Sequence, residues 1–148
     1  KYTDYLIINE VELGYCVGRG MRDEDGLIDV AAVSTAAREL LDAGVGNLVI
    51  IHYPEGSVVA ERDGRTVSMP SYSPSKEDIV STVGAGDAFC AGAAIGLTYG
   101  KHLAEACEIG AHLAASVIVT SENVCPRFLP RELGLDMDVQ VDETDEPL

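Results

Sequence analysis

The hydrophobic positions of this chain fall into short continuous runs and into longer stretches with the spacing of a helix. Residues 5–8 and 48–51 are continuous apolar runs, which are typical of strands buried on both faces of a sheet. Between these runs, apolar residues recur at helical spacing over residues 28–43, and Gly44 follows as a stop signal. A strand, a helix and a strand in this order predict two parallel strands with a right-handed crossover, and therefore an α/β fold.

The later part of the chain predicts a hairpin and two more helices. Residues 57–60 and 65–69 flank Arg62-Asp63-Gly64, and Asp-Gly between alternating residues indicates a hairpin, which we expect at the edge of the sheet. Helices are predicted over residues 86–97 and 103–118, and Gly100 separates them. A short helix is expected over residues 13–17, and the loop of residues 18–26, with its mixed charges, is expected at the surface.

Composition limits the classes of protein that fit. The 148 residues suffice for one domain with a hydrophobic core, and the net charge of -15 argues against binding to nucleic-acid phosphates. Six acidic residues and no basic residue fall within residues 136–146, so we expect an acidic tail over residues 135–148 after a domain of residues 1–134. The four cysteines are scattered without a C-x-x-C pair, which favours buried free thiols over disulfides or a metal site.

The chain shows no sign of membrane insertion or export. No apolar run is long enough to span a membrane, and the first residues resemble neither a signal peptide nor a start with Met. We therefore expect a cytoplasmic protein with no membrane partner, of which this chain is a part.

A glycine-rich turn, Gly84-Ala85-Gly86-Asp87, runs directly into a helix of small residues. Glycines lack a Cβ, so the backbone can turn tightly and its N–H groups can face a ligand. A helix that begins here directs its unpaired N–H groups and its positive dipole end at an anion, most commonly phosphate. Phosphate repels a carboxylate, so Asp87 fits better as a general base that takes a proton from a substrate hydroxyl. The alternative is that Asp87 only caps the helix and the glycines only turn the chain.

Thr82-Val83-Gly84-Ala85-Gly86-Asp87-Ala88-Phe89 resembles the signature D-T-x-G-A-G-D-x-F of the ribokinase or PfkB family of sugar and nucleoside kinases. The dinucleotide fingerprint G-x-G-x-x-G does not fit, because Phe89 stands where that motif needs its third glycine. The resemblance covers roughly residues 4–133, which correspond to the C-terminal half of the family's chain. It implies a ribokinase-like three-layer αβα sandwich with a mostly parallel sheet, here an incomplete fragment with an edge hairpin.

The resemblance also implies a reaction, which is ATP-dependent phosphotransfer to a hydroxyl of a sugar or a nucleoside-like small molecule. Asp87 corresponds to the catalytic base of the family. Gly84, Ala85 and Gly86 correspond to the anion hole, which binds the phosphate and stabilises the charge that develops during transfer.

Metal and nucleotide contacts are implied at five further positions. Asn9 and Glu12 resemble the family's N-x-x-E motif, which acts on Mg²⁺ and phosphate, usually through water, although the same spacing also fits a helix cap. Nucleotide contacts are implied at Thr82, Gly56 and His112. For His112 the alternative is an ordinary histidine of the core or the surface.

Two stretches depart from the family pattern. Ser81 replaces the leading Asp, which in the family helps to hold a monovalent cation, so activation by such a cation is doubtful. The family's phosphate-binding T-x-G-x-x-G reads His52-Tyr53-Pro54-Glu55-Gly56 here, and Pro54 offers no N–H. His52 is either a ring donor in place of the threonine or simply a histidine at the end of a strand.

Two hypotheses follow. The first is the C-terminal half of an ATP- and Mg²⁺-dependent small-molecule kinase, which needs the missing N-terminal half and is inactive as this chain alone. The second is a non-catalytic ribokinase-like fragment or pseudokinase that acts in nucleotide binding or assembly. In both cases the first strand lacks a preceding partner, so we expect an uncovered apolar sheet edge that can support a homo-oligomer.

Overall fold

The computed structural model describes residues 2–71, 74–122, 124–126, 128 and 130–135. The expected acidic tail lies outside the described residues, except for its first residue, Leu135. The elements are, in chain order, β1 (Tyr5–Asn9), α1 (Glu10–Val17), α2 (Val30–Ala43), β2 (Leu48–Tyr53), β3 (Gly56–Glu61), β4 (Thr66–Pro70), α3 (Ala85–Thr98), α4 (Leu103–Ile118) and a short 3-10 helix, η1 (Pro130–Leu133). The order of strands and helices that the sequence predicts is confirmed.

The four strands form one sheet in the order β1-β2-β3-β4. β1 and β2 are parallel, as predicted for strands joined through a helix. The pairs β2–β3 and β3–β4 are antiparallel, because their short connections cannot make the crossover that parallel strands need. The β3–β4 connection contains the predicted Asp63-Gly64 turn, with Gly64 at a φ of 106°. This part of the sheet is therefore mixed, and the predicted hairpin places β4 at its edge.

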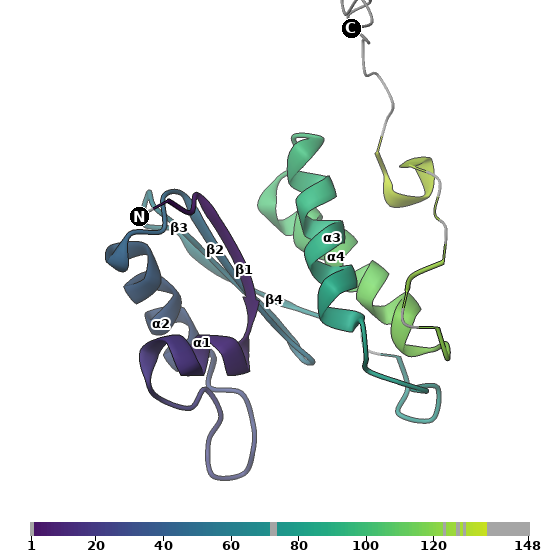
Figure 1. The fold of residues 1–148 in the computed structure, drawn as a ribbon, viewed down its shortest axis with the longest axis horizontal. Coiled ribbons are helices and arrows are strands. Elements are labelled where there is room, and N and C mark those ends of the chain that lie inside the picture. Colours follow the sequence, from purple (N-terminus) through teal and green to yellow (C-terminus); the bar gives the residue numbers. More distant parts are fainter. Residues whose placement is uncertain (1, 72–73, 123, 127, 129, 136–148) are drawn as a thin grey trace, which may run out of the picture.

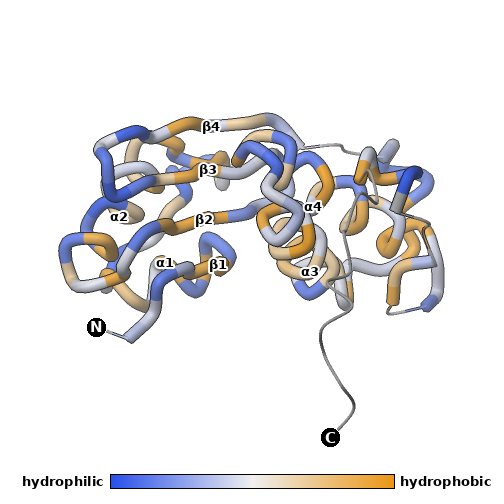
Figure 2. Tube along the Cα trace, turned by 90° about the horizontal axis from the view of Figure 1, so that it is seen from above, coloured by the Kyte–Doolittle hydropathy of each residue, from blue (hydrophilic) through white to orange (hydrophobic). Residues whose placement is uncertain are grey.

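Helices cover both faces of the sheet and give three layers, with α1 and α2 on one side and α3 and α4 on the other (Figure 1). Successive side chains of a strand point to opposite faces, so β2 contributes to two hydrophobic clusters. Hydrophobic residues lie along β2 and on α3 and α4 (Figure 2). The clusters join Val49 and Ile51 to Val33, Ala37 and Leu41 on one face, and Leu48 and Ile50 to Phe89, Ala93 and Cys107 on the other.

β1 is less buried than its sequence predicts. Its residues are half-buried at most, and Tyr5 exposes 58% of its surface. The physical reason is that, among the described residues, β1 pairs only with β2 and so lies at an edge of the sheet. The prediction of a strand buried on both faces is correct for β2 and wrong for β1. The expectation of an uncovered sheet edge agrees with this position.

The helices α3 and α4 lie against each other at very short range. A Cβ atom added to Gly92 of α3 would lie 2.8 Å from the Cα atom of Gly110 in α4, and one added to Gly96 would lie 2.8 Å from the Cα atom of Ala106. The small residues of α3 therefore allow the backbones of the two helices to meet. In the described part of the chain, no helix is both long enough and apolar enough to cross a bilayer.

Two expectations about exposure need correction. The loop of residues 18–26 is largely exposed, but Met21 is buried because it belongs to the hydrophobic cluster that includes Leu13 of α1 and Val33 of α2. The cysteines are free, as predicted, but only Cys107 is fully buried. Cys16, in the last turn of α1, is exposed.

Candidate active site

The predicted anion turn forms the N-terminus of α3. Gly84 is the N-cap residue, and its φ of 85° is a left-handed conformation that favours glycine. The N–H of Ala85 donates to the carbonyl oxygen of Thr82 at 3.3 Å and closes the turn. The N–H groups of Gly86 and Asp87 follow in the first helical turn, where no intrahelical acceptor exists. The local geometry is therefore that of an anion site at a helix N-terminus.

Asp87 is the third residue of α3 and is exposed. The cap of this helix is Gly84, and no side chain makes a cap hydrogen bond there. In the described part of the chain, no hydrogen bond or ion pair engages the carboxylate of Asp87. The capping alternative therefore has no support in the geometry, and the role of Asp87 as a base stays a prediction.

Asn9 and Glu12 stand at the N-terminus of α1 and form a capping box. The Asn9 Oδ1 atom accepts from the N–H groups of Val11 at 2.9 Å and Glu12 at 2.8 Å, and the Glu12 Oε2 atom accepts from the Asn9 N–H at 2.9 Å. The helix cap that the spacing also fits is therefore present. This cap orients the two side chains at the carboxyl end of β1, where open α/β sheets bind their ligands.

His52, which replaces the threonine of the family motif, lies against the anion turn. Its ring stacks on the ring of Phe89 with centroids 4.8 Å apart, and a Cβ atom added to Gly86 would lie 3.3 Å from the His52 Cε1 atom. Burial lowers the pKa of His52, and the nearby carboxylates of Glu12 and Glu10 oppose this effect only in part. The ring is therefore neutral near pH 7 and forms a wall of the site. This stacking is not visible in the sequence.

A cavity of about 310 Å³ lies between the N-termini of α1 and α3, the end of β2 and one side of α4. Four predicted site residues line it, namely Asn9, Thr82, Ala85 and Gly86. The other lining residues include Glu10, His52, Tyr53, Pro54 and Phe89, and along α4 they include Ala111, Ala114 and Ala115. The cavity therefore combines a polar end at two helix N-termini with an apolar wall, as a site for a small organic phosphate would.

Two predicted nucleotide contacts do not line this cavity. Gly56 begins β3, and an added Cβ atom would collide with the carbonyl oxygen of Met69, so the glycine allows the hairpin strands to meet. His112 is exposed on α4 beside Phe128, with ring centroids 5.4 Å apart, and lines a separate hollow with Lys101. Nucleotide binding at either position stays a prediction.

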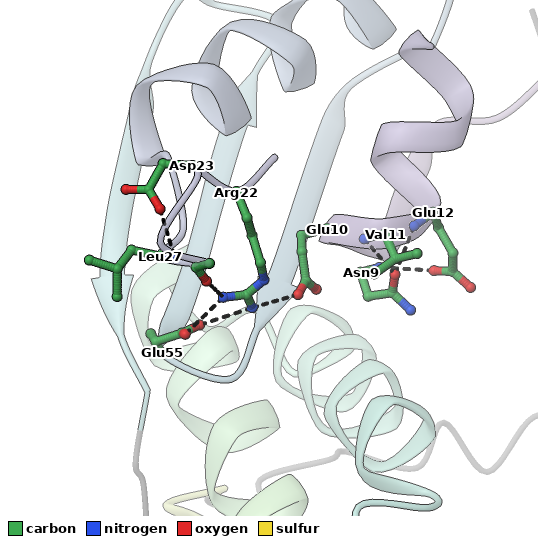
Figure 3. A network of polar contacts seen from close by, with 9 residues as sticks. Asn9, Glu10, Val11, Glu12, Arg22, Asp23, Leu27 and Glu55 are labelled. Carbon is green, nitrogen blue, oxygen red and sulfur yellow. Dashed lines mark hydrogen bonds and ion pairs between the residues drawn. The ribbon is translucent and has the colours of Figure 1, made fainter. Parts of the chain in front are cut away.

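Sequence reasoning missed a network of polar contacts at the cavity (Figure 3). The guanidinium of Arg22 donates to the Glu10 Oε1 atom at 2.7 Å and to the Glu55 Oε1 atom at 3.0 Å. It also donates to the carbonyl oxygen of Gly26 at 3.0 Å. The hydrogen bonds to Glu55 and, to a smaller extent, Glu10 raise the pKa of Arg22, and the bond from Arg22 lowers the pKa of the Glu55 carboxyl. We call Glu10, Arg22, Gly26 and Glu55 the Arg22 network.

The site provides few metal ligands of its own. Within the described ranges, no group of three or more His, Cys, Asp or Glu side chains could hold a metal ion. Mg²⁺ in phosphate-transfer sites keeps several waters and takes ligands from the substrate phosphates, so it needs only one or two carboxylates. The Glu12 carboxylate is exposed and, among the described residues, accepts a hydrogen bond through one oxygen, and it has the hard oxygen chemistry that Mg²⁺ prefers.

Comparison with known proteins places these features in a family. The pfkB family of carbohydrate kinases matches residues 1–130. The adenosine kinase of Schizosaccharomyces pombe is 32% identical over 133 residues, which are 88% of this chain and 38% of that protein. The 1-phosphofructokinase of Rhodobacter capsulatus is 35% identical over 102 residues, which are 69% of this chain and 29% of that protein.

Solved structures confirm the fold class. The ribokinase of Thermotoga maritima has a TM-score of 0.67 at 26% identity and covers 88% of this chain and 41% of its own. The ribokinase of Arabidopsis thaliana with ribose and ATP has a TM-score of 0.68 at 22% identity and covers 82% of this chain and 38% of its own. The chain thus has a ribokinase-like fold and spans less than half the length of each of these relatives. It belongs to the pfkB family of carbohydrate kinases.

Proposed function

We propose that this chain is the phosphate-transfer part of a kinase that moves a phosphoryl group from ATP to a hydroxyl of a sugar or a nucleoside-like small molecule. The observation that carries the proposal is the cavity in which the N-terminal turn of α3 meets the N-terminus of α1. The relatives support the acceptor class, since one is an adenosine kinase and another a 1-phosphofructokinase. Because ATP is a cytoplasmic metabolite, we also propose a cytoplasmic location.

We propose the following roles for the site residues. Asp87 accepts the proton of the attacking hydroxyl, since its carboxylate is exposed at the helix N-terminus and has no other engagement among the described residues. Gly84, Ala85 and Gly86 present backbone N–H groups and the positive end of α3 to the developing charge. Asn9 and Glu12 would hold Mg²⁺ through water, and this ion would neutralise phosphate charge.

The experiment that tests this proposal is Asp87→Asn in the full-length protein that contains this chain. Loss of a general base lowers kcat by about 10²- to 10⁴-fold, or roughly 3 to 5.5 kcal/mol. Loss of a negative charge in the first helical turn costs stability of only about 0.3–1 kcal/mol. We therefore expect kcat to collapse, the thermal midpoint to fall slightly, and the Kd for ATP to hold or improve as a negative charge leaves the phosphate site.

The assay uses ATP with a panel of nucleosides, pentoses and phosphorylated hexoses as acceptors. Asp42→Asn is the matched control, because Asp42 is an exposed helical aspartate in α2 and is not a cavity-lining residue. It should retain the parent kcat. An Asp87→Asn protein with kcat within about threefold of the parent would exclude Asp87 as the base.

A non-catalytic role is the second candidate, and one observation favours it. In the family, the segment that corresponds to residues 52–56 carries phosphate contacts. In this chain, the same segment places the stacked ring of His52 and the side chain of Pro54 at the cavity, and Pro54 has no N–H to donate. A full-length protein that binds ATP but transfers phosphate to no acceptor of the panel would support this second candidate.

A further inference from the structure

Glu10 places a buried carboxylate in the wall of the cavity. It is the first residue of α1, it exposes 9% of its surface, and it lines the cavity together with His52 and Gly86. A buried carboxylate is costly unless a cation or hydrogen-bond donors compensate it. In a site for phosphates it presents a second difficulty, because its charge repels the ligand.

Arg22 compensates this carboxylate. Its Nη2 atom lies 2.7 Å from the Glu10 Oε1 atom, and the side chains of Arg22 and Glu10 expose 30% and 11% of their surface (Figure 3). Both partners are thus largely withdrawn from water, so this pair is screened less than a surface pair. Arg22 itself is not a cavity-lining residue, so it acts on the cavity through Glu10.

The same guanidinium reaches Glu55 in the turn between β2 and β3. The Glu55 carboxylate accepts from Arg22 at 3.0 Å and 3.3 Å, and the neighbouring Pro54 lines the cavity. Because Glu55 exposes 49% of its side chain, solvent compensates its charge in part. Loss of Arg22 would therefore leave one badly compensated charge, that of Glu10.

We propose that Arg22 is a positioning residue that sets affinity for polyphosphate ligands, because it neutralises Glu10 and so allows nucleotide phosphates to enter beside that carboxylate. The inference rests on the proposed function, since it assumes that the cavity binds ATP. Arg22 lies outside the family motifs, and its proposed effect on ligand affinity is electrostatic.

A purely mechanical role for the Arg22 network leads to a different result. If Arg22 only held the loop and the turn in place, its loss would weaken every ligand of the cavity to a similar extent. If Arg22 neutralises Glu10, the affinity lost on removal of Arg22 grows with the number of phosphates of the ligand. This loss of affinity disappears when Glu10 is made neutral. The two roles are therefore separable by measurement.

The experiment measures Kd for ATP, ADP and AMP by calorimetry on the full-length protein and on Arg22→Met, Glu10→Gln and the double variant. Arg19→Met is the matched control, because Arg19 lies in the same loop, pairs with Glu39 at 2.8 Å and is not a cavity-lining residue. We expect Arg22→Met to raise the Kd for ATP about tenfold or more, with a smaller rise for ADP and little for AMP. Glu10→Gln, the double variant and Arg19→Met should bind ATP within about threefold of the parent or more tightly.

The outcomes separate the possible failures. The charge role would be overturned by equal losses of affinity for ATP, ADP and AMP. It would also be overturned if the double variant bound ATP as weakly as Arg22→Met does. Should Arg22→Met fail to fold, the comparison of Glu10→Gln with the double variant decides, and a tenfold loss of ATP affinity between them would overturn the inference. A parent protein that binds no ATP would overturn the proposed function and this inference together, whereas ATP binding that is insensitive to Arg22→Met would overturn the inference alone.

Discussion

Gly92→Ala tests the close approach of α3 and α4. A Cβ atom at Gly92 would lie 2.8 Å from the Gly110 Cα atom, 2.9 Å from the Ile109 carbonyl oxygen and 3.0 Å from the Gly110 nitrogen. All three atoms belong to the backbone of α4, so no side chain can rotate to make room. The added methyl group therefore has to push the two helices apart.

The expected magnitude is a balance of opposing effects. Alanine is better than glycine in a helix interior by about 1 kcal/mol, and burial of one more methyl group is favourable by about 0.8 kcal/mol. Separation of the helices removes close contacts along the whole seam, including the one between Gly96 and Ala106. Overpacked cores show net losses of typically about 1–3 kcal/mol, and a backbone obstacle belongs to the upper part of that range. We expect Gly92→Ala to lower the free energy of unfolding by about 2 kcal/mol.

The assay is urea unfolding of the full-length protein, together with the Kd for ATP. The affinity should also fall, since α4 carries the cavity residues Ala111, Ala114 and Ala115. Gly20→Ala is the control, because an added Cβ atom there meets no atom within 4 Å, and its stability should change by less than about 0.5 kcal/mol. A Gly92→Ala protein as stable as the parent, with unchanged ATP affinity, would refute the reasoning.

Three further predictions concern single side chains in the full-length protein. Because burial lowers the pKa of His52, the unfolded chain takes up a proton below about pH 6.5 that the folded chain does not, so the stability due to the neutral ring is present above that pH and is lost as pH falls. The thermal midpoint of the parent should therefore fall more steeply between about pH 7 and 5.5 than that of His52→Gln, and equal slopes would contradict this account. Burial raises the pKa of Cys107 to about 11, so iodoacetamide at pH 8 should modify Cys16 long before Cys107, with the order read by mass spectrometry; equal rates would show that Cys107 is accessible. Asp29 caps α2 by accepting from the Ala32 N–H at 2.9 Å, so Asp29→Ala should cost about 1 kcal/mol in urea unfolding, and no loss would mean that the cap is redundant.

Features that depend on neighbours in the chain could be predicted from the sequence. The buried strand β2 follows from a continuous apolar run, and the β3–β4 hairpin follows from Asp63-Gly64. The anion turn follows from Gly84 and Gly86, which together with Asp87 also carry the resemblance to the family. In each case the information lies within about ten residues, the length over which turns and periodic patterns act.

Features that depend on contacts between distant segments could not be predicted in this way. Arg22 reaches Glu10 and Glu55 across 12 and 33 positions of the chain, and nothing in its loop distinguishes it from Arg19. The glycine pattern suggested a phosphate contact for Gly56, whereas its neighbour in space is the carbonyl oxygen of Met69. A glycine shows that something approaches closely, and only the fold shows whether that is a ligand or a strand.

The wall that α4 contributes to the cavity consists largely of alanines, with Ala111, Ala114 and Ala115 along one side of the helix. Alanine has no rotamers, so these three positions have no side-chain entropy to lose when a ligand packs against them, whereas an ordered Met or Gln would lose up to about 2 kcal/mol each. A flat ligand therefore meets a surface that is already in its bound form. The wall also cannot adjust, so discrimination between ligands there depends on their shape.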